Sequence, residues 1–200
     1  MKVYLLGLIV ILSLGLASEV IGQSDSTQLS QKQQMKLRGY IGGVYERSSV
    51  SPVHTNSFGL QAAILIKNHF QFGFYGKNHT YHNYREQLIF PNFFQMNYKH
   101  AGLLIGYRTH LEKKYEFNLE SKFGMGEVKW NELETGNPYL ADKFRIFHLQ
   151  MSVDYLLTKF LAVNGFAGYR WIGDLDITGL SNADFEGLYY GIVVKLGIFK

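Results

Sequence analysis

The chain has 200 residues, 46% of them hydrophobic and 16% aromatic, with 21 glycines, no cysteine and a formal net charge of +4. This length fits a single domain, and this content of glycine and aromatic residues favours an all-β chain. The small charge excess, with no dense block of Lys or Arg, argues against a nucleic-acid partner, and a chain without cysteine forms no disulfide.

The N-terminus has the pattern of a secretory signal peptide. Lys2 precedes an apolar stretch over residues 3–16, which suits a signal-peptide core but is shorter than the ~20 residues of a spanning helix. Small residues allow cleavage after Ala17 or after Gly22, and we favour Gly22 because a polar run rich in Gln and Ser begins there. We therefore predict three parts: a signal peptide over residues 1–22, a flexible polar periplasmic leader over residues 23–38, and a β-barrel over residues 39–200.

Beyond the leader, apolar and polar residues alternate in eight segments separated by turn residues. Several segments are far longer than the ~5–6 residues usual for strands of soluble proteins, and long enough for the ~9–11 residues that cross a bilayer. We predict strands over residues 39–47, 57–67, 70–77, 95–108, 115–129, 143–157, 160–172 and 185–199.

The connections between these segments alternate in length. They are short after the second, fourth and sixth segments, and long after the others, over residues 48–56, 78–94, 130–142 and 173–184. Short periplasmic turns and longer outer loops are typical of outer-membrane barrels, whereas a soluble lipocalin-like barrel has no reason to sort its loops. The pattern predicts an all-β, eight-stranded, antiparallel, up-and-down transmembrane β-barrel in the outer membrane.

The polar faces of the later segments carry charges of nearly balanced sign. In a membrane barrel these faces point into the lumen, and an eight-stranded barrel is filled by its own side chains. We predict a polar network in the lumen made of Glu116, Glu120, Lys122, His148, Asp154, Arg170 and Lys195, with Arg108 as a further basic partner. Tyr75 and Trp130 are out of phase with their segments, which predicts a bulge or a lumenal position for each. The first segment alternates too weakly to fix which face points inward.

The last segment of the chain, from Gly168 onwards, contains three short motifs: Tyr169-Arg170-Trp171, Gly179-Leu180-Ser181 followed by Asp184, and Lys195-Leu196-Gly197-Ile198-Phe199. This segment resembles the end of small outer-membrane β-barrel proteins of the Bacteroidota. The resemblance implies an eight-stranded barrel and brings no catalytic residues with it. One departure is that Lys200 takes the phase of the usual lipid-facing aromatic residue, while Phe199 falls on the other face.

Few residues suggest chemistry. His148 and Ser152 invite comparison with hydrolases that act on lipid A, but they would lie ~13 Å apart along one strand, beyond hydrogen-bond reach. His79 and His82 form an H-x-x-H pattern in the second long loop, where we expect solvated side chains and no metal site. The same loop is rich in aromatic residues, and Tyr81, Tyr84 and Phe90 are candidates for contact with a partner.

The sequence therefore predicts a non-enzymatic outer-membrane barrel without a cofactor, monomeric, with a structural or adhesive role. Its expected partners are outer-membrane lipid and lipopolysaccharide, together with an extracellular protein or surface ligand bound through four long loops. Two alternatives stay open: a barrel hydrolase that modifies lipid A, and a soluble periplasmic carrier of the lipocalin type.

Overall fold

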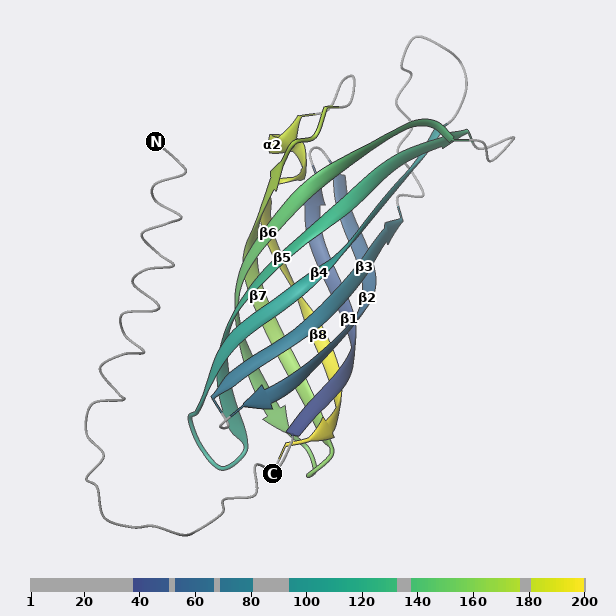
Figure 1. Ribbon diagram of the computed structural model, residues 1–200. Helices are drawn as coiled ribbons and strands as arrows, with labels where there is room; N and C mark the ends of the chain where they lie inside the picture. The colour runs from purple at the N-terminus through teal and green to yellow at the C-terminus, as the bar shows by residue number, and fades with distance from the viewer. Residues whose placement is uncertain are drawn as a thin grey trace, which may run out of the picture. The chain divides into compact units, whose positions relative to one another are not determined.

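The computed structural model describes residues 38–50, 53–66, 69–80, 94–132, 138–176 and 181–199. Within these ranges the elements are β1 (Arg38–Val50), β2 (Val53–Ile66), β3 (Phe70–Thr80), β4 (Phe94–His110), β5 (Tyr115–Glu132), β6 (Pro138–Leu156), β7 (Leu161–Gly173), α2 (Asn182–Phe185) and β8 (Gly187–Ile198). Each strand pairs antiparallel with the next, and β8 pairs with β1, so the sheet closes into a barrel (Figure 1). The predicted eight-stranded antiparallel barrel is confirmed.

Several strands continue beyond their predicted ends. The predicted long connections over residues 48–56 and 130–142 are wrong, because β1 and β2 leave only residues 51–52 between them, and β5 and β6 only residues 133–137. Residues read as turn formers pair instead: Ser48 lies opposite Thr55, and their hydroxyl oxygens are 3.1 Å apart. Hydroxyl pairs of this kind stabilise neighbouring strands. The ladder of β5 and β6 changes register between Trp130 and Asn131, where a bulge was one of the two predicted alternatives.

The two faces of the sheet differ in polarity. Large apolar side chains face outward on every strand; Phe74, Met125 and Leu188, for example, are 69%, 67% and 75% exposed. Charged and polar side chains alternate with them and are buried inside the barrel. Tyr75 is buried inside the barrel, the lumenal one of its two predicted alternatives. Phe199 faces inward as its phase predicted, with its ring centroid 6.4 Å from that of Tyr40.

Apolar clusters occupy both ends of the interior. Near Arg38 and the C-terminal end of β8 the cluster comprises Tyr40, Ala63, Leu65, Leu104, Leu156, Ala162 and Phe199. At the opposite end it comprises Met96, Tyr98, Val128, Phe144, Ile146, Ile172, Leu175 and Phe185. A third small cluster, with Phe166 and Val193, lies against the polar residues between them. The inner face of β1 carries Tyr40, Val44 and Glu46, which settles the orientation that the sequence left open.

The single turn of α2 lies at the end of the barrel opposite the C-terminus (Figure 1). Its start is capped by Asp184, whose Oδ2 accepts hydrogen bonds from the Ser181 backbone N–H at 2.7 Å and from the Ser181 hydroxyl at 2.8 Å. Phe185 is fully buried, and its ring centroid lies 5.4 Å from that of Tyr98. Within the described ranges, no helix has the length and apolar character needed to cross a membrane.

Candidate functional site

Many charged and polar side chains of the described residues are buried inside the barrel. All seven residues of the predicted network lie there, each at most 2% exposed: Glu116, Glu120, Lys122, His148, Asp154, Arg170 and Lys195. They do not form one contiguous site. Six of them fall into three groups along the barrel axis, each with its own charge pairing, and His148 lies in a row of imidazole rings beside the third group.

The group nearest Arg38 and the C-terminal end of β8 consists of two ion pairs. Lys195 Nζ lies 2.8 Å and 3.1 Å from the two carboxylate oxygens of Asp154, and the Asn118 side-chain N–H donates to the same carboxylate at 3.0 Å. The ammonium also lies 4.6 Å from the centre of the Tyr40 ring, a favourable cation–π contact. Arg108 forms an ion pair with Glu116, so the predicted basic partner meets an acid of the neighbouring strand. Each buried charge in this group therefore faces an opposite one.

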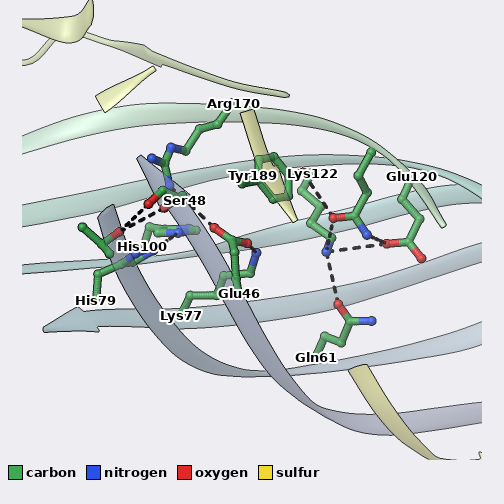
Figure 2. Close-up of polar contacts among 12 residues, drawn as sticks. Glu46, Ser48, Gln61, Lys77, His79, His100, Glu120, Lys122, Arg170 and Tyr189 are labelled. Carbon is green, nitrogen blue, oxygen red and sulfur yellow. Dashed lines mark hydrogen bonds and ion pairs between the residues drawn. The ribbon is translucent and has the colours of Figure 1, made fainter. Parts of the chain in front are cut away.

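Lys122 organises the middle group (Figure 2). Its ammonium donates to Gln61 Oε1 at 3.1 Å and to Gln150 Oε1 at 3.0 Å, and lies 3.5 Å from a carboxylate oxygen of Glu120. The Gln150 amide in turn donates to Glu120 at 2.6 Å, and the Tyr189 hydroxyl donates to Gln150 at 3.2 Å. Four strands are thus connected across the lumen by one cation and two amides.

The third group includes charges that the sequence did not predict. Glu46 forms an ion pair with Lys77 and lies 3.6 Å from a guanidinium nitrogen of Arg170, so one carboxylate serves two cations (Figure 2). Arg170 also donates from Nε to the backbone oxygen of Phe185 at 2.8 Å. This contact ties the connection between β7 and β8 to the charged interior. Glu46 shares the inward phase of Tyr40 and Val44, which would have identified it had the orientation of β1 been known.

Three imidazole rings lie in a row beside this third group. His79 and His100 approach through their Nε2 atoms at 3.3 Å, and the ring centroids of His100 and His148 are 5.2 Å apart. A hydrogen bond between two Nε2 atoms needs one of them as acceptor, so at least one of the two rings is neutral. The predicted solvated loop position of His79 is wrong: β3 continues to Thr80, and the ring is fully buried. The described chain holds no group of three His, Asp or Glu side chains arranged to bind a metal ion.

The candidate hydrolase pair lies inside the barrel as well. His148 and Ser152 share the inner face of β6, and both are buried. The rings of Tyr75 and Tyr189 pack edge-on against His148, at centroid distances of 5.9 Å and 5.1 Å. Both ring nitrogens of His148 and the Ser152 hydroxyl lack hydrogen-bond partners among the described residues. The two side chains therefore do not form a nucleophile–base pair in this structure.

The outer wall carries aromatic residues near both ends. Beside the short turns, Phe70, Tyr107, Tyr115 and Phe160 are exposed, and the ring of Tyr155 packs against that of Tyr115. Trp171 belongs to the other end, where its ring lies 5.2 Å from Phe147 and 4.7 Å from Tyr169. An open apolar depression of about 510 Å³ is lined by residues of β1, β2, β3 and β4. The predicted contact residues Tyr81, Tyr84 and Phe90 lie outside the described residues.

No protein-family model matches this sequence, and no curated protein is similar to it in sequence. Solved structures with a similar fold do exist. The crystal structure of Neisserial surface protein A (NspA) aligns with a TM-score of 0.58 at 12% identity, over 82% of this chain and 97% of that chain. The crystal structure of Ail, the attachment invasion locus protein of Yersinia pestis, aligns with a TM-score of 0.47 at 11% identity, over 83% and 98% of the two chains. At such low identity the likeness to NspA supports the barrel fold and nothing more specific.

Proposed function

We propose that this chain is a non-enzymatic, eight-stranded β-barrel of a Gram-negative outer membrane, with a structural or adhesive role. The observation that carries this proposal is the reversed polarity of the barrel. Side chains such as Phe58, Leu60 and Phe74 are more than 60% exposed, whereas Glu120, Lys122 and other charged residues are fully buried. Exposing so much contiguous apolar surface to water is unfavourable, and a bilayer removes this cost.

The same polarity argues against a soluble carrier of the lipocalin type. Such a carrier needs an apolar cavity inside and a polar surface outside, because its ligand replaces water within the barrel. Here the interior between the end clusters is occupied by ion pairs and amides, and the outward positions of β8 are Leu188, Tyr190, Ile192, Val194, Leu196 and Ile198. With this arrangement, a carrier would have its apolar binding surface on the outside of the barrel instead of the inside.

The lipid A hydrolase alternative is disfavoured by where its residues lie. Lipid A occupies the outer leaflet around a membrane barrel, so catalytic side chains must face outward or stand on the outer rim. His148 and Ser152 face inward and are surrounded by Tyr75, Tyr189 and the polar groups of the neighbouring strands.

The adhesive part of the proposal depends on the connections at the end of the barrel away from the C-terminus. The connections around residues 51–52 and 133–137 are short. The proposed surface for contact with an extracellular partner therefore consists of residues 81–93 and 174–186, instead of the four long loops expected from the sequence. Tyr81, Tyr84 and Phe90 in the first of these remain the proposed contact residues. The signal peptide over residues 1–22, the leader over 23–38, a monomeric state and the resemblance to Bacteroidota barrels also remain parts of the proposal.

The decisive experiment compares the gel mobility of the full chain from purified outer membranes, unboiled and boiled in detergent. A closed membrane barrel stays folded until heated, so we expect a band that shifts on boiling. Recovery in the soluble periplasm without a shift would overturn the proposal.

Replacing residues 81–93 by a short Gly-Ser turn tests the adhesive role. The replacement should keep the gel shift on boiling and remove binding to extracellular ligands. Binding that survives the replacement would contradict the adhesive role.

A further inference from the structure

A group of cationic side chains faces outward on three adjacent strands, near the end of the barrel away from the C-terminus. We call this group the cation patch; it consists of Lys99 on β4, Lys129 on β5, and Lys143 and Arg145 on β6. The strand register places Lys99 opposite Glu127 and Glu127 opposite Lys143, so these three residues form one row across the strands. Arg145 lies one outward position nearer the membrane, beside Met125.

The cation patch is only partly paired with acids of the described chain. Glu127 accepts contacts from Lys99 at 3.3 Å and from Lys129 at 3.1 Å, so two ammonium groups share one carboxylate. Arg145 pairs with Asp174 at 2.9 Å, but both side chains are more than half exposed. Exposed pairs of this kind contribute little and exchange readily for a better anion. Glu127 and Asp174 thus pair with three of the four cations, and Lys143 forms no ion pair with a described residue. The nearby carboxylate of Asp142 accepts hydrogen bonds from the backbone N–H groups of Lys143 and Asp176.

The height of the cation patch matches the outer boundary of a membrane. On β6 the outward side chains from Tyr155 to Phe147 are apolar, and this stretch advances ~27 Å along the strand at ~3.4 Å per residue. With a strand tilt of ~40°, the stretch covers ~20 Å of the membrane normal, and Arg145 follows at ~26 Å. The apolar band of an outer-membrane barrel is ~25 Å tall. Arg145 therefore lies at the boundary and Lys143 just beyond it, where lipid phosphates are found.

The rest of the described wall differs at this height. The outward positions there include Phe58 on β2, Trp171 on β7 and Tyr190 on β8. Among the outward positions described on β1–β3, β7 and β8, the one Lys or Arg is Arg47 on β1. Interfacial aromatic residues anchor a barrel without selecting a headgroup, whereas clustered Arg and Lys side chains bind phosphate through charge-assisted hydrogen bonds. The cation patch is thus a local feature of β4–β6 and not a general property of the rim.

We propose that the cation patch binds the phosphate groups of a phosphorylated glycolipid of the outer leaflet, whose acyl chains lie along the apolar wall below. This inference rests on the proposed function, because it requires the barrel to be in the outer membrane. The wall beneath the cation patch suits acyl chains: Met125 and Met151 are exposed there, and the rings of Phe123 and Phe147 pack together at 4.8 Å. Arg145 offers two parallel N–H donors to one phosphate, and the lysines act as point charges around it.

The test measures how much purified lipid A the full-length barrel retains in detergent micelles, by native mass spectrometry. A triple variant, Lys99→Gln with Lys143→Gln and Arg145→Gln, is compared with a matched triple variant at the opposite rim, Lys113→Gln with Lys114→Gln and Lys159→Gln. We expect the first to bind bisphosphorylated lipid A roughly tenfold more weakly and the second to bind within about twofold of the parent chain, since each lost phosphate contact weakens binding severalfold. Dephosphorylated lipid A should bind the parent chain as weakly as bisphosphorylated lipid A binds the first variant.

Equal losses in the two variants, or equal retention of phosphorylated and dephosphorylated lipid A, would overturn the inference. The inference would also be overturned if millimolar inorganic phosphate competed as effectively as lipid A. The cation patch would then bind a free anion rather than a lipid. The boiling shift is measured on every sample. A parent chain that lacks the shift contradicts the proposed function itself, whereas a shift combined with unselective lipid binding contradicts only the cation patch.

Discussion

The ion pair between Asp154 and Lys195 offers a direct test of whether the interior is a dehydrated core. The two side chains come from β6 and β8, which are not neighbours, and reach each other across the lumen at 2.8 Å with 2% and 1% of their side-chain surface exposed. Asp154→Asn keeps the volume and removes the charge. Lys195 then keeps the Tyr40 ring as a neighbour but loses the one carboxylate with which it forms an ion pair in the described chain.

The expected cost is large because a buried charge loses its opposite charge. Removing one partner of a buried pair costs about 3–5 kcal/mol, which corresponds to a roughly 160-fold to 5,000-fold shift in the unfolding equilibrium. Glu127→Gln is the matched control, because its ion pairs with Lys99 and Lys129 are on the outer surface and contribute about 1 kcal/mol or less. Both variants are unfolded in urea from phospholipid vesicles and followed by tryptophan fluorescence and by the fraction of heat-shifted band.

A double variant separates charge from packing. Asp154→Leu combined with Lys195→Met removes both charges and fills the same space, so most of the lost free energy should return. If Asp154→Asn costs no more than Glu127→Gln, water must reach the pair and the reasoning from a dehydrated interior is refuted. If the double variant is as unstable as the single one, the loss comes from packing and not from an unpaired charge.

Further substitutions test the close approach of strands, the outer cap and the enzyme alternative. Gly102→Ala should lower the free energy of unfolding by about 1–3 kcal/mol, because the added methyl group would overlap a carbonyl oxygen of β5. In the control Gly43→Ala the methyl group meets open space, so the free energy of unfolding should stay within about 0.5 kcal/mol of the parent value. Equal urea midpoints for the two variants would contradict this. Phe185→Ala should cost about 3 kcal/mol in the same titration, because its ring is fully buried against other aromatic rings; a cost under about 1 kcal/mol would mean that the ring is not packed there. His148→Ala combined with Ser152→Ala should leave the lipid A species of the outer membrane unchanged, as measured by mass spectrometry. A new species would support the lipid A hydrolase alternative.

The faces of the strands were predictable from the sequence because alternation is a property of each strand by itself. Residues one apart point to opposite sides, so the apolar set of β6 or β8 identifies the outer face without knowledge of any partner. The ends of the strands were not predictable in this way. Ser48 and Thr55 are turn formers by composition, and only their position opposite each other makes them a strand pair.

The pairing of the buried charges was beyond the sequence for a related reason. The alternation of polar and apolar residues shows that Asp154 and Lys195 face inward. It does not show the height of each residue along the barrel axis, because that height depends on the tilt and stagger of all the strands. Glu46 and Lys77 went unpredicted because the orientation of β1 was ambiguous and because β3 alternates poorly. His79 was misplaced because its strand continues past a stretch of polar residues that reads as a loop.

The arrangement of the interior also limits where this protein can act on a partner. The charged layer lies between one apolar cluster around Tyr98, Phe144 and Phe185 and another around Tyr40 and Phe199, so a solute reaching it through the described interior would have to displace packed rings. Ion pairs hold seven of the strands against one another across the lumen, and the Gln61 amide connects β2 to Lys122, which stabilises the barrel. Recognition of a lipid or protein partner then falls to the outer wall and to the connections between strands. It follows that inward substitutions should change stability with little effect on partner binding, and that outward substitutions on β4–β6 should do the reverse.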